Sequence, residues 1–336
     1  MPVPDAINQT LAFLVALESS YGVAATLNAS TDTVLPYIGD GDPPAPTPVN
    51  YLFNGNIGRS PVVLGPQRRT TPAGRFREWE IPVLVKGLGT AYSASAFPPN
   101  EFDRLLRIAG FDRVFSPTPT ARHIYTPTPV GTTYASGTVR QFTQGDVYDH
   151  VGVLCDVRME TQELGVPIWT FPSKGIMASL PAAGAMPALT AGAPNVIPPV
   201  AQAIVANIGA WTGVGIRAVR FRLNRTIEAA RLDMSAAGGH LGWVPAGMAP
   251  ELEFELERPA RGTFNPEAEF NSATSRAVSV VFGTGVNNTY EIAFPQAQLA
   301  NSPTPGNAQS LATVTLVFRA FASSPTANDF LTITQR

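Results

Sequence analysis

Glutamate alternates with apolar residues in the stretch "ELEFELE", residues 251–257. Successive side chains of a β-strand point to opposite faces of the sheet, so all four carboxylates would lie on one face. They belong to Glu251, Glu253, Glu255 and Glu257. Paired carboxylates can divide acid and base roles when their environments differ. Four equivalent carboxylates on a regular strand offer no such difference, so we expect a structural role for the row and no enzyme activity.

Two other stretches relate to this row. "RAVRFRLNR", residues 217–225, places Arg220 and Arg222 on one face of a predicted strand. Antiparallel pairing of this strand with the glutamate strand would set arginines opposite glutamates, each pair contributing at most about 1 kcal/mol. The row would then be a solvated, charge-matched sheet face. In the first half of the chain, Glu78 and Glu80 have the same alternate spacing and are the candidate counterparts of the row.

Histidine, cysteine and glycine motifs give no indication of a cofactor or metal site. The three histidines, at positions 123, 150 and 240, lack metal-ligand spacing. Asp146, Asp149 and His150 are close in sequence, which a surface turn explains. Cys155, the only cysteine, lies in the apolar stretch "VGVLCDV" and is predicted to be a small core residue. The chain also lacks a glycine-rich phosphate loop and the nucleophile elbow of hydrolases.

Composition favours a β protein that hides surface by self-association. Of the 336 residues, 44% are hydrophobic and only 14% are charged, below the roughly 25% of ordinary globular proteins. The 32 prolines and 29 glycines indicate many turns. A formal charge of -2 argues against a dedicated nucleic-acid-binding protein with a strong basic field. The apolar stretch 11–17 is too short to span a bilayer and no basic segment precedes it, so we expect a soluble chain.

Prolines, glycines and hydrophobic alternation divide the first part of the chain into strands, loops and one helix. Residues 6–20 form a short helix or a strand that ends at "SSYG", and a proline-rich extended arm follows at 22–50. The stretch 98–111 has the prolines and Asn100 of a helix start, followed by an apolar stripe. The other predicted elements are a charged strand at 75–87, proline-threonine loops within 116–130, a hairpin at 138–160 and a closing strand at 166–180.

The same order of elements recurs in the second part. An Ala- and Pro-rich segment, 181–199, is predicted to be a linker. After it come strands at 216–234, the glutamate strand, a short helix opened by Asn265 and Pro266, a hairpin at 276–294 and a closing strand at 310–322. This recurrence predicts an internal duplication, with the common element order of β-sandwiches as the alternative. We therefore expect a mainly β fold of two tandem β-sandwich or half-barrel modules: 1–180, which includes the arm, and 200–336.

The arrangement resembles the major tail tube proteins of long, non-contractile-tailed bacteriophages (siphophages). The resemblance begins at "LESSYGVAATLNASTDTVLPY" (17–37), a short Glu and Tyr-Gly element followed by a Thr- and Val-rich arm. It continues through the two β modules, each with one short flanking helix. It ends at "VFGTGVNNTYEIAFPQAQL" (281–299), which is similar to the late hairpin of that family with its proline-containing strand. These features span most of the chain.

The resemblance implies a structural virion protein, made in the bacterial host cytoplasm and located in the tail. Its chains would assemble into rings that stack into a hollow tube. The glutamate row would face the lumen, where carboxylates repel DNA phosphates so that the duplex slides through during ejection into the host. Many family members carry one module and form hexamers, whereas three chains of two modules each would form a pseudo-hexameric ring.

The implied partners are other copies of the chain, the tape measure, the tail terminator and the distal tail proteins. Double-stranded DNA would be a transient, non-specific passenger, and no cofactor or membrane is implied. Contacts between stacked rings are expected from the arm at 22–50, which includes Asp40 and Asp42. The loop at 116–130, which includes Arg122 and His123, is the second candidate.

Two other functions remain open on sequence alone. A capsid-decoration protein or another β-rich virion component would share the composition without an acidic lumen. A carbohydrate-binding β-sandwich would use exposed tryptophans to stack on sugar rings. The four candidates are Trp79, Trp169, Trp211 and Trp243, but they lie among apolar neighbours, which favours core packing.

Overall fold

The computed structural model has a mainly β fold, with two short helices among the residues that it describes. It describes residues 10–36, 47–48, 76–85, 102–117, 122–129, 134–143, 146–161, 166–178, 182–184, 204–209, 211, 215–229, 242–283, 289–308, 311–324 and 327–336.

The elements of the first half, in chain order, are β1 (Thr10–Leu17), β2 (Thr33–Val34), β3 (Thr47–Pro48), β4 (Phe76–Leu84), α1 (Asp103–Ile108), β5 (Phe111–Ser116), β6 (Arg122–Pro127), β7 (Gly137–Thr143), β8 (Asp146–Cys155), β9 (Arg158–Thr161), β10 (Ile168–Met177) and β11 (Ala182–Ala183). Those of the second half are β12 (Val205–Ile208), β13 (Ile216–Arg222), β14 (Thr226–Ala229), β15 (Trp243–Gly247), β16 (Glu251–Glu257), α2 (Pro266–Asn271), β17 (Arg276–Phe282), β18 (Tyr290–Leu299), β19 (Thr304–Ala308), β20 (Leu311–Ala320) and β21 (Thr332–Gln335).

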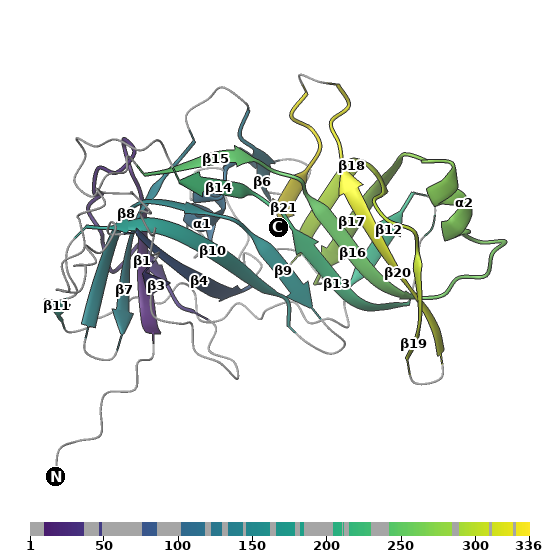
Figure 1. The fold of residues 1–336 in the computed structure, drawn as a ribbon, viewed down its shortest axis with the longest axis horizontal. Coiled ribbons are helices and arrows are strands. Elements are labelled where there is room, and N and C mark those ends of the chain that lie inside the picture. The colour runs from purple at the N-terminus through teal and green to yellow at the C-terminus, as the bar shows by residue number, and fades with distance from the viewer. Residues whose placement is uncertain are drawn as a thin grey trace, which may run out of the picture.

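An uninterrupted run of antiparallel pairs joins the two halves. Its spatial order is β3–β4–β10–β9–β13–β16–β20–β19. In Figure 1 this run crosses the molecule from β4 and β10 on the left to β20 and β19 on the right. The run consists of two four-strand units: β3–β4–β10–β9, and β13–β16–β20–β19. Each unit has its charged strand in second place and its closing strand in third, and the two units meet where β9 pairs with β13.

Three further strands of each half pair in the same order. β10 also pairs with β8, β8 with β7, and β7 with β1. Correspondingly, β20 pairs with β18, β18 with β17, and β17 with β12. In each half a helix lies between the charged strand and the hairpin along the chain: α1 between β4 and β7–β8, and α2 between β16 and β17–β18. The order of strand pairing is therefore the same for seven strands of each half, whereas β2, β5, β6, β11, β14, β15 and β21 have no counterpart among the described residues of the other half.

A shared apolar core holds the two halves together. The inward residues of β16, Leu252, Phe254 and Leu256, are completely buried. Trp169 on β10 packs edge-to-face against Phe221 on β13, with ring centroids 5.8 Å apart. One cluster of buried side chains extends from the first half to the second. Because alternation buries one side chain and exposes the next, this core fixes which face of the eight-strand run carries charge.

Several predicted elements are present. Residues 10–17 form a strand, the second of the two alternatives for that stretch, because β1 pairs with β2 and β7. Both helices exist, and the Asn265 side chain caps α2 by accepting a hydrogen bond from the amide of Ala268 at 3.2 Å. The hairpins at 138–160 and 276–294 correspond to β7–β8 and β17–β18. Of the predicted linker, residue 181 and residues 185–199 lie outside the described residues, and β11 (182–183) pairs with β8.

The prediction of loops within 116–130 was wrong for residues 122–127, which form β6. Residues 117, 128 and 129 lie outside strands, and residues 118–121 and 130 lie outside the described residues. Residues 111–127 contain the β5–β6 hairpin, and β6 is extended by β21 near the end of the chain. β21 in turn pairs with β18, so it bridges the two halves. The proline-threonine clusters hid β6, which pairs locally with β5 and also with β21, about two hundred residues away in the sequence. Local propensity carries no information about such a partner.

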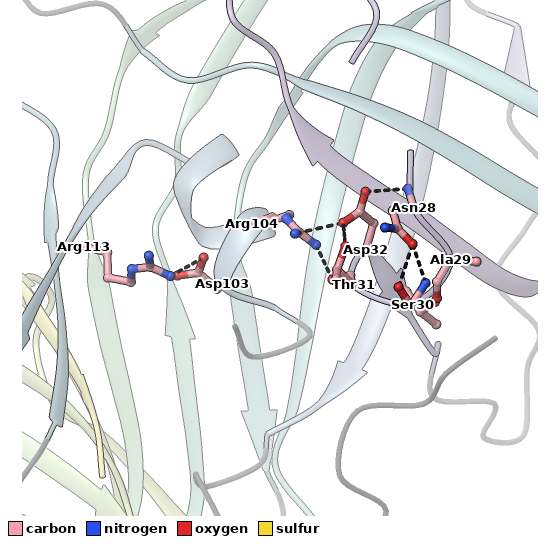
Figure 2. Close-up of polar contacts among 9 residues, drawn as sticks. Asn28, Ala29, Ser30, Thr31, Asp32, Asp103, Arg104 and Arg113 are labelled. Atoms are coloured by element: carbon pink, nitrogen blue, oxygen red, sulfur yellow. Dashed lines mark hydrogen bonds and ion pairs between the residues drawn. The ribbon is translucent and has the colours of Figure 1, made fainter. Parts of the chain in front are cut away.

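The first part of the expected arm is bonded to its own chain. Figure 2 shows the Asp32 carboxylate between the amide of Asn28 and the guanidinium of Arg104 on α1. The Arg104 ion pair has an N–O distance of 2.9 Å, and Arg104 also donates to the Thr31 carbonyl at 2.6 Å. Residues 22–36 therefore stabilise the α1 end of the fold. Asp40 and Asp42 lie outside the described residues.

The "ESSYG" element, residues 18–22, ties three parts of the fold together. The Glu18 carboxylate accepts hydrogen bonds from the amides of Gly22 and Gly152, both at 2.8 Å, and from the Ser136 hydroxyl at 2.6 Å. The Tyr21 hydroxyl accepts from the amide of Trp243 at 2.6 Å, which links the element to β15. Gly152 has a φ of +60°, and a Cβ there would lie 2.9 Å from the Tyr21 ring, so this approach requires glycine.

We expect Glu18→Gln to lower the free energy of unfolding by about 1–3 kcal/mol. Glutamine replaces one carboxylate oxygen by an NH2 group, which is a donor, so some of the amide and hydroxyl groups that now donate to Glu18 would lose their acceptor. Urea unfolding monitored by circular dichroism measures this loss. Ser19→Ala is the matched control, since Ser19 is the exposed neighbour in the same turn. Equal stability of the Glu18→Gln protein and the wild type would contradict the proposed role of the carboxylate.

Candidate functional site

The candidate site is the face of the eight-strand run that points away from the shared core, which we call the charged sheet face. At one end of this face, Phe76 and Ile176 pack against Trp243 of β15, and the remainder carries the charged side chains. There are twelve of these charged side chains: Glu78, Glu80, Arg158, Glu160, Lys174, Arg220, Arg222, Glu251, Glu253, Glu255, Glu257 and Arg319. Two observations place these side chains on one face of the sheet. Each either alternates with a buried core residue along its own strand or lies opposite another of the twelve on the neighbouring strand. Five are basic and seven acidic, so the face has a formal charge of -2.

The predicted pairing of arginines with glutamates is present in the second half. Arg220 lies opposite Glu253 and Arg222 opposite Glu251. Arg220 Nη1 donates to Glu253 Oε1 at 2.6 Å, and the Glu251 carboxylate forms its ion pair with Arg319 on the other neighbouring strand. Glu251 and Glu253 are therefore neutralised by cross-strand arginines.

The rest of the row carries uncompensated charge. Glu255 lies opposite Ala218 and Thr315, and Glu257 opposite Thr313. Neither carboxylate forms an ion pair among the described residues. The row is therefore divided: one end is charge-matched and the other end presents free carboxylates.

The first half repeats the matched end of the row. Lys174 Nζ lies 2.9 Å from Glu78 Oε1, across the β10–β4 pair. This pair occupies the place that Arg319 and Glu251 occupy across the β20–β16 pair. Glu78 and Glu80 thus lie on the same continuous face as the glutamate row, within the first four-strand unit.

A shallow depression lies on the charged sheet face where the two units meet. It has a volume of about 360 Å³ and is lined by β9, β10 and β13. The polar side chains around it are Arg158, Glu160, Thr170, Arg220 and Arg222. Glu160 and Arg220 are already engaged, because Arg220 Nε donates to Glu160 Oε1 at 2.8 Å. Hydrogen bonds from Arg220 to Glu160 and Glu253 raise the pKa of its guanidinium, which keeps this group cationic.

The carboxylates of the charged sheet face have similar surroundings. Glu78 lies beside Lys174; Glu80, Glu160, Glu251 and Glu253 lie beside arginines; and Glu255 and Glu257 form no ion pair among the described residues. Within the described ranges, no group of three or more histidine, cysteine, aspartate or glutamate side chains is placed to hold a metal ion. No helix in the described part of the chain has the length and apolarity needed to cross a membrane.

The other candidate residues have different surroundings. Arg122 and His123 begin β6, and the His123 side chain is only 1% exposed, so it is not available for contacts between rings. Trp79, Trp169 and Trp243 are buried, and Trp211 stacks on Phe264 with ring centroids 4.5 Å apart. Packing inside the fold therefore occupies the tryptophans that a sugar-binding site would need to expose.

Two further predictions concern β8. Cys155 is a fully buried core residue, as predicted, and burial raises the pKa of its thiol to about 12. His150 is also buried, with its ring 4.2 Å from that of Trp79, so the prediction of a surface turn was wrong. Asp149 is ion-paired with Arg140 on β7 at 2.6 Å.

Sequence reasoning missed four members of the charged sheet face: Arg158, Glu160, Lys174 and Arg319. Arg158 and Glu160 flank the buried Met159 in the stretch "RMET", which shows the same alternation as the glutamate strand. That stretch is only four residues long, and its role depends on its two neighbours, β10 and β13. A short alternating segment becomes informative only when its partners are known.

Comparison with known proteins does not assign the chain to a family. A scan against protein-family models finds no match, and a search of curated proteins finds none.

Proposed function

We propose that the protein is a structural tail subunit of a siphophage, which self-assembles into rings that stack into a hollow tube for DNA. The observation that carries this proposal is the repetition of the four-strand unit along the eight-strand run. Each unit presents one edge that pairs with the opposite edge of the next unit, as β9 does with β13. A contact between unlike edges is heterologous, and such contacts generate closed rings when the rotation closes.

The two ends of the run provide the edges for such a contact. β19 is the last strand of the second unit, as β9 is of the first. β3 is the first strand of the first unit, as β13 is of the second. On its outer side, β19 pairs with no strand among the described residues, and its side chains from Thr304 to Asn307 are exposed. Pairing of β19 with the β3 edge of the next copy would continue the sheet and remove the exposed edges.

The register of the internal joint predicts the register between copies. At the joint, Arg158 lies opposite Arg222. The Lys174–Glu78 pair of the first unit is equivalent to the Arg319–Glu251 pair of the second, and positions on the other strands can be matched by counting from these pairs. By this count Thr304 on β19 is equivalent to Arg158 on β9, and Thr47 on β3 is equivalent to Arg222 on β13. We therefore expect Thr304 of one copy to lie opposite Thr47 of the next.

Two units per chain support a ring of three chains with six similar positions. In this ring the charged sheet face would line the lumen, and its acidic balance, with Glu255 and Glu257 uncompensated, would repel the phosphates of passing DNA. The tape measure would occupy the lumen before DNA does, and the tail terminator and distal tail proteins would meet the ends of the tube. Its place in the virion would be the tail.

The proposal is tested by electron microscopy of purified protein together with a cross-link. Negative-stain images at high concentration should show hollow rings or tubes, with three chains per ring. A Thr47→Cys, Thr304→Cys double variant should form disulfide-linked oligomers on mild oxidation, while each single variant stays monomeric under denaturing conditions. The buried Cys155 thiol does not compete, since its raised pKa leaves it protonated. Compact monomers in the images, with no linked oligomers, would refute the proposal.

A further inference from the structure

Two arginines face each other at the joint between the units. Arg158 on β9 lies directly opposite Arg222 on β13. Directly opposed side chains in an antiparallel pair have Cβ atoms about 4.5–5.5 Å apart, and like charges at this separation are destabilising. Elsewhere on the charged sheet face, the cross-strand ion pairs of Lys174, Arg220 and Arg319 are all formed with glutamates. This pair therefore needs a compensating negative charge.

The carboxylates nearby compensate only part of this charge. Arg158 Nη2 lies 2.7 Å from Glu80 Oε2. The carboxylate opposite Arg222 is Glu251, which is ion-paired with Arg319 instead. Arg222 forms no ion pair with any residue in the described ranges, and its side chain is exposed to solvent. One guanidinium at the joint thus remains uncompensated.

The depression described above lies over this pair. Its polar lining includes both guanidinium groups and the hydroxyl-bearing Thr170, which lies opposite Arg158 on the other side. The volume of about 360 Å³ accommodates a small oxyanion together with its remaining water. Arginine presents a flat fork of donors that matches the oxygens of a phosphate group.

We propose that the depression binds a phosphate group, held between Arg158 and Arg222 with the Thr170 hydroxyl as a further donor. The phosphate could belong to a free ion or to the backbone of DNA, and the same donors would recognise both. Binding of free phosphate does not depend on tube assembly, so this inference goes beyond the proposed function. In a tube, the site would be a weak point of DNA contact within an otherwise repulsive lumen.

The site belongs to the internal joint alone. At the predicted joint between copies, the equivalent positions are Thr47 and Thr304, which carry no charge. We therefore expect one phosphate site per chain and not one per unit.

The test uses the full-length chain at low ionic strength, in a chloride buffer, and isothermal titration calorimetry with inorganic phosphate. We expect one site per chain, an affinity at least tenfold weaker for Arg222→Gln, and an unchanged affinity for Arg258→Gln. Arg258→Gln is the matched control because it removes the same charge from an exposed ion pair, that with Glu267, outside the charged sheet face. Without phosphate, Arg222→Gln should melt at the same or a higher temperature than the wild type, because it relieves the repulsion from Arg158. This second readout separates loss of the site from loss of the fold.

A second titration with a short DNA duplex distinguishes the sources of the phosphate. If the duplex competes with inorganic phosphate for the wild type, and this competition is absent for Arg222→Gln, the site binds backbone phosphates as well as the free ion. Binding of inorganic phosphate without competition by the duplex would support a site for the free ion. Equal binding of phosphate and acetate would overturn the proposal in favour of a non-selective basic patch or a carboxylate of another copy. Equal affinity of wild type and Arg222→Gln, or no binding of either ligand, would also overturn it.

Discussion

Replacing Trp169 by alanine should lower the free energy of unfolding by about 3–5 kcal/mol, the range for removing a large aromatic side chain from a packed core. Trp169 is completely buried where the two halves meet. Its ring lies edge-to-face against Phe221 of β13 and Tyr290 of β18, with centroids 5.8 and 5.5 Å away. The halves of the chain cannot close such a cavity without moving relative to each other.

Chemical denaturation followed by tryptophan fluorescence and circular dichroism measures this effect. Trp169→Phe is the informative comparison, because it keeps an aromatic ring and removes an indole N–H that has no hydrogen-bond partner among the described residues. We expect it to lose less than half as much stability as Trp169→Ala. Val114→Ala, at a side chain that is 57% exposed, should change stability by less than about 0.5 kcal/mol. Similar values for Val114→Ala and Trp169→Ala would show that the shared core is not what joins the halves.

The second large effect is a loss of stability in acid that depends on His150. This side chain is fully buried beside Trp79, and burial lowers its pKa from 6.5 to about 4. The Arg77 charge also lowers the pKa, whereas the Val139 backbone and the Asp149 carboxylate oppose the shift. The folded chain therefore keeps His150 neutral at a pH where the unfolded chain has already bound a proton.

The sign of the pH dependence follows from this difference. Above pH 6.5 both states are neutral at this position and stability is unaffected. As the pH falls from 6.5 to about 4, only the unfolded state binds the proton, so the free energy of unfolding declines, by about 3 kcal/mol for His150 at pH 4.

The effect is measured as the difference between the stability profiles of the wild type and His150→Phe from pH 8 to pH 4. Phenylalanine preserves a flat apolar ring beside Trp79 and cannot titrate. The difference between the two proteins should be constant above pH 7 and shift in favour of the variant below 6.5. His123, whose pKa is also lowered to about 4 by burial and by Arg113, still contributes a slope to both proteins. A constant difference down to pH 4 would contradict the assignment to His150.

Alternation along the sequence determined which side of each long strand faces the core. Because successive residues point to opposite faces, "ELEFELE" and "RAVRFR" define their buried and charged faces without knowledge of any neighbour. The start of α2 was equally local, since Asn265 supplies an acceptor for the first free amides and Pro266 has the backbone angle of a helix start. The burial of Cys155 followed from its apolar neighbours. These features depend on residues within a few positions of one another.

Tertiary structure decided which strands are neighbours. The joint between β9 and β13, the burial of His150 and the pairing of β6 with β21 all depend on contacts between distant segments. Nothing in the sequence indicated a role for Arg158, and strand alternation predicted only glutamate partners for Arg222. The two arginines are 64 positions apart, and only the register of the joint sets them opposite each other over one depression. The physical reason is that the face of a strand is a property of its own backbone, whereas its partner and register are selected by the core that many segments form together.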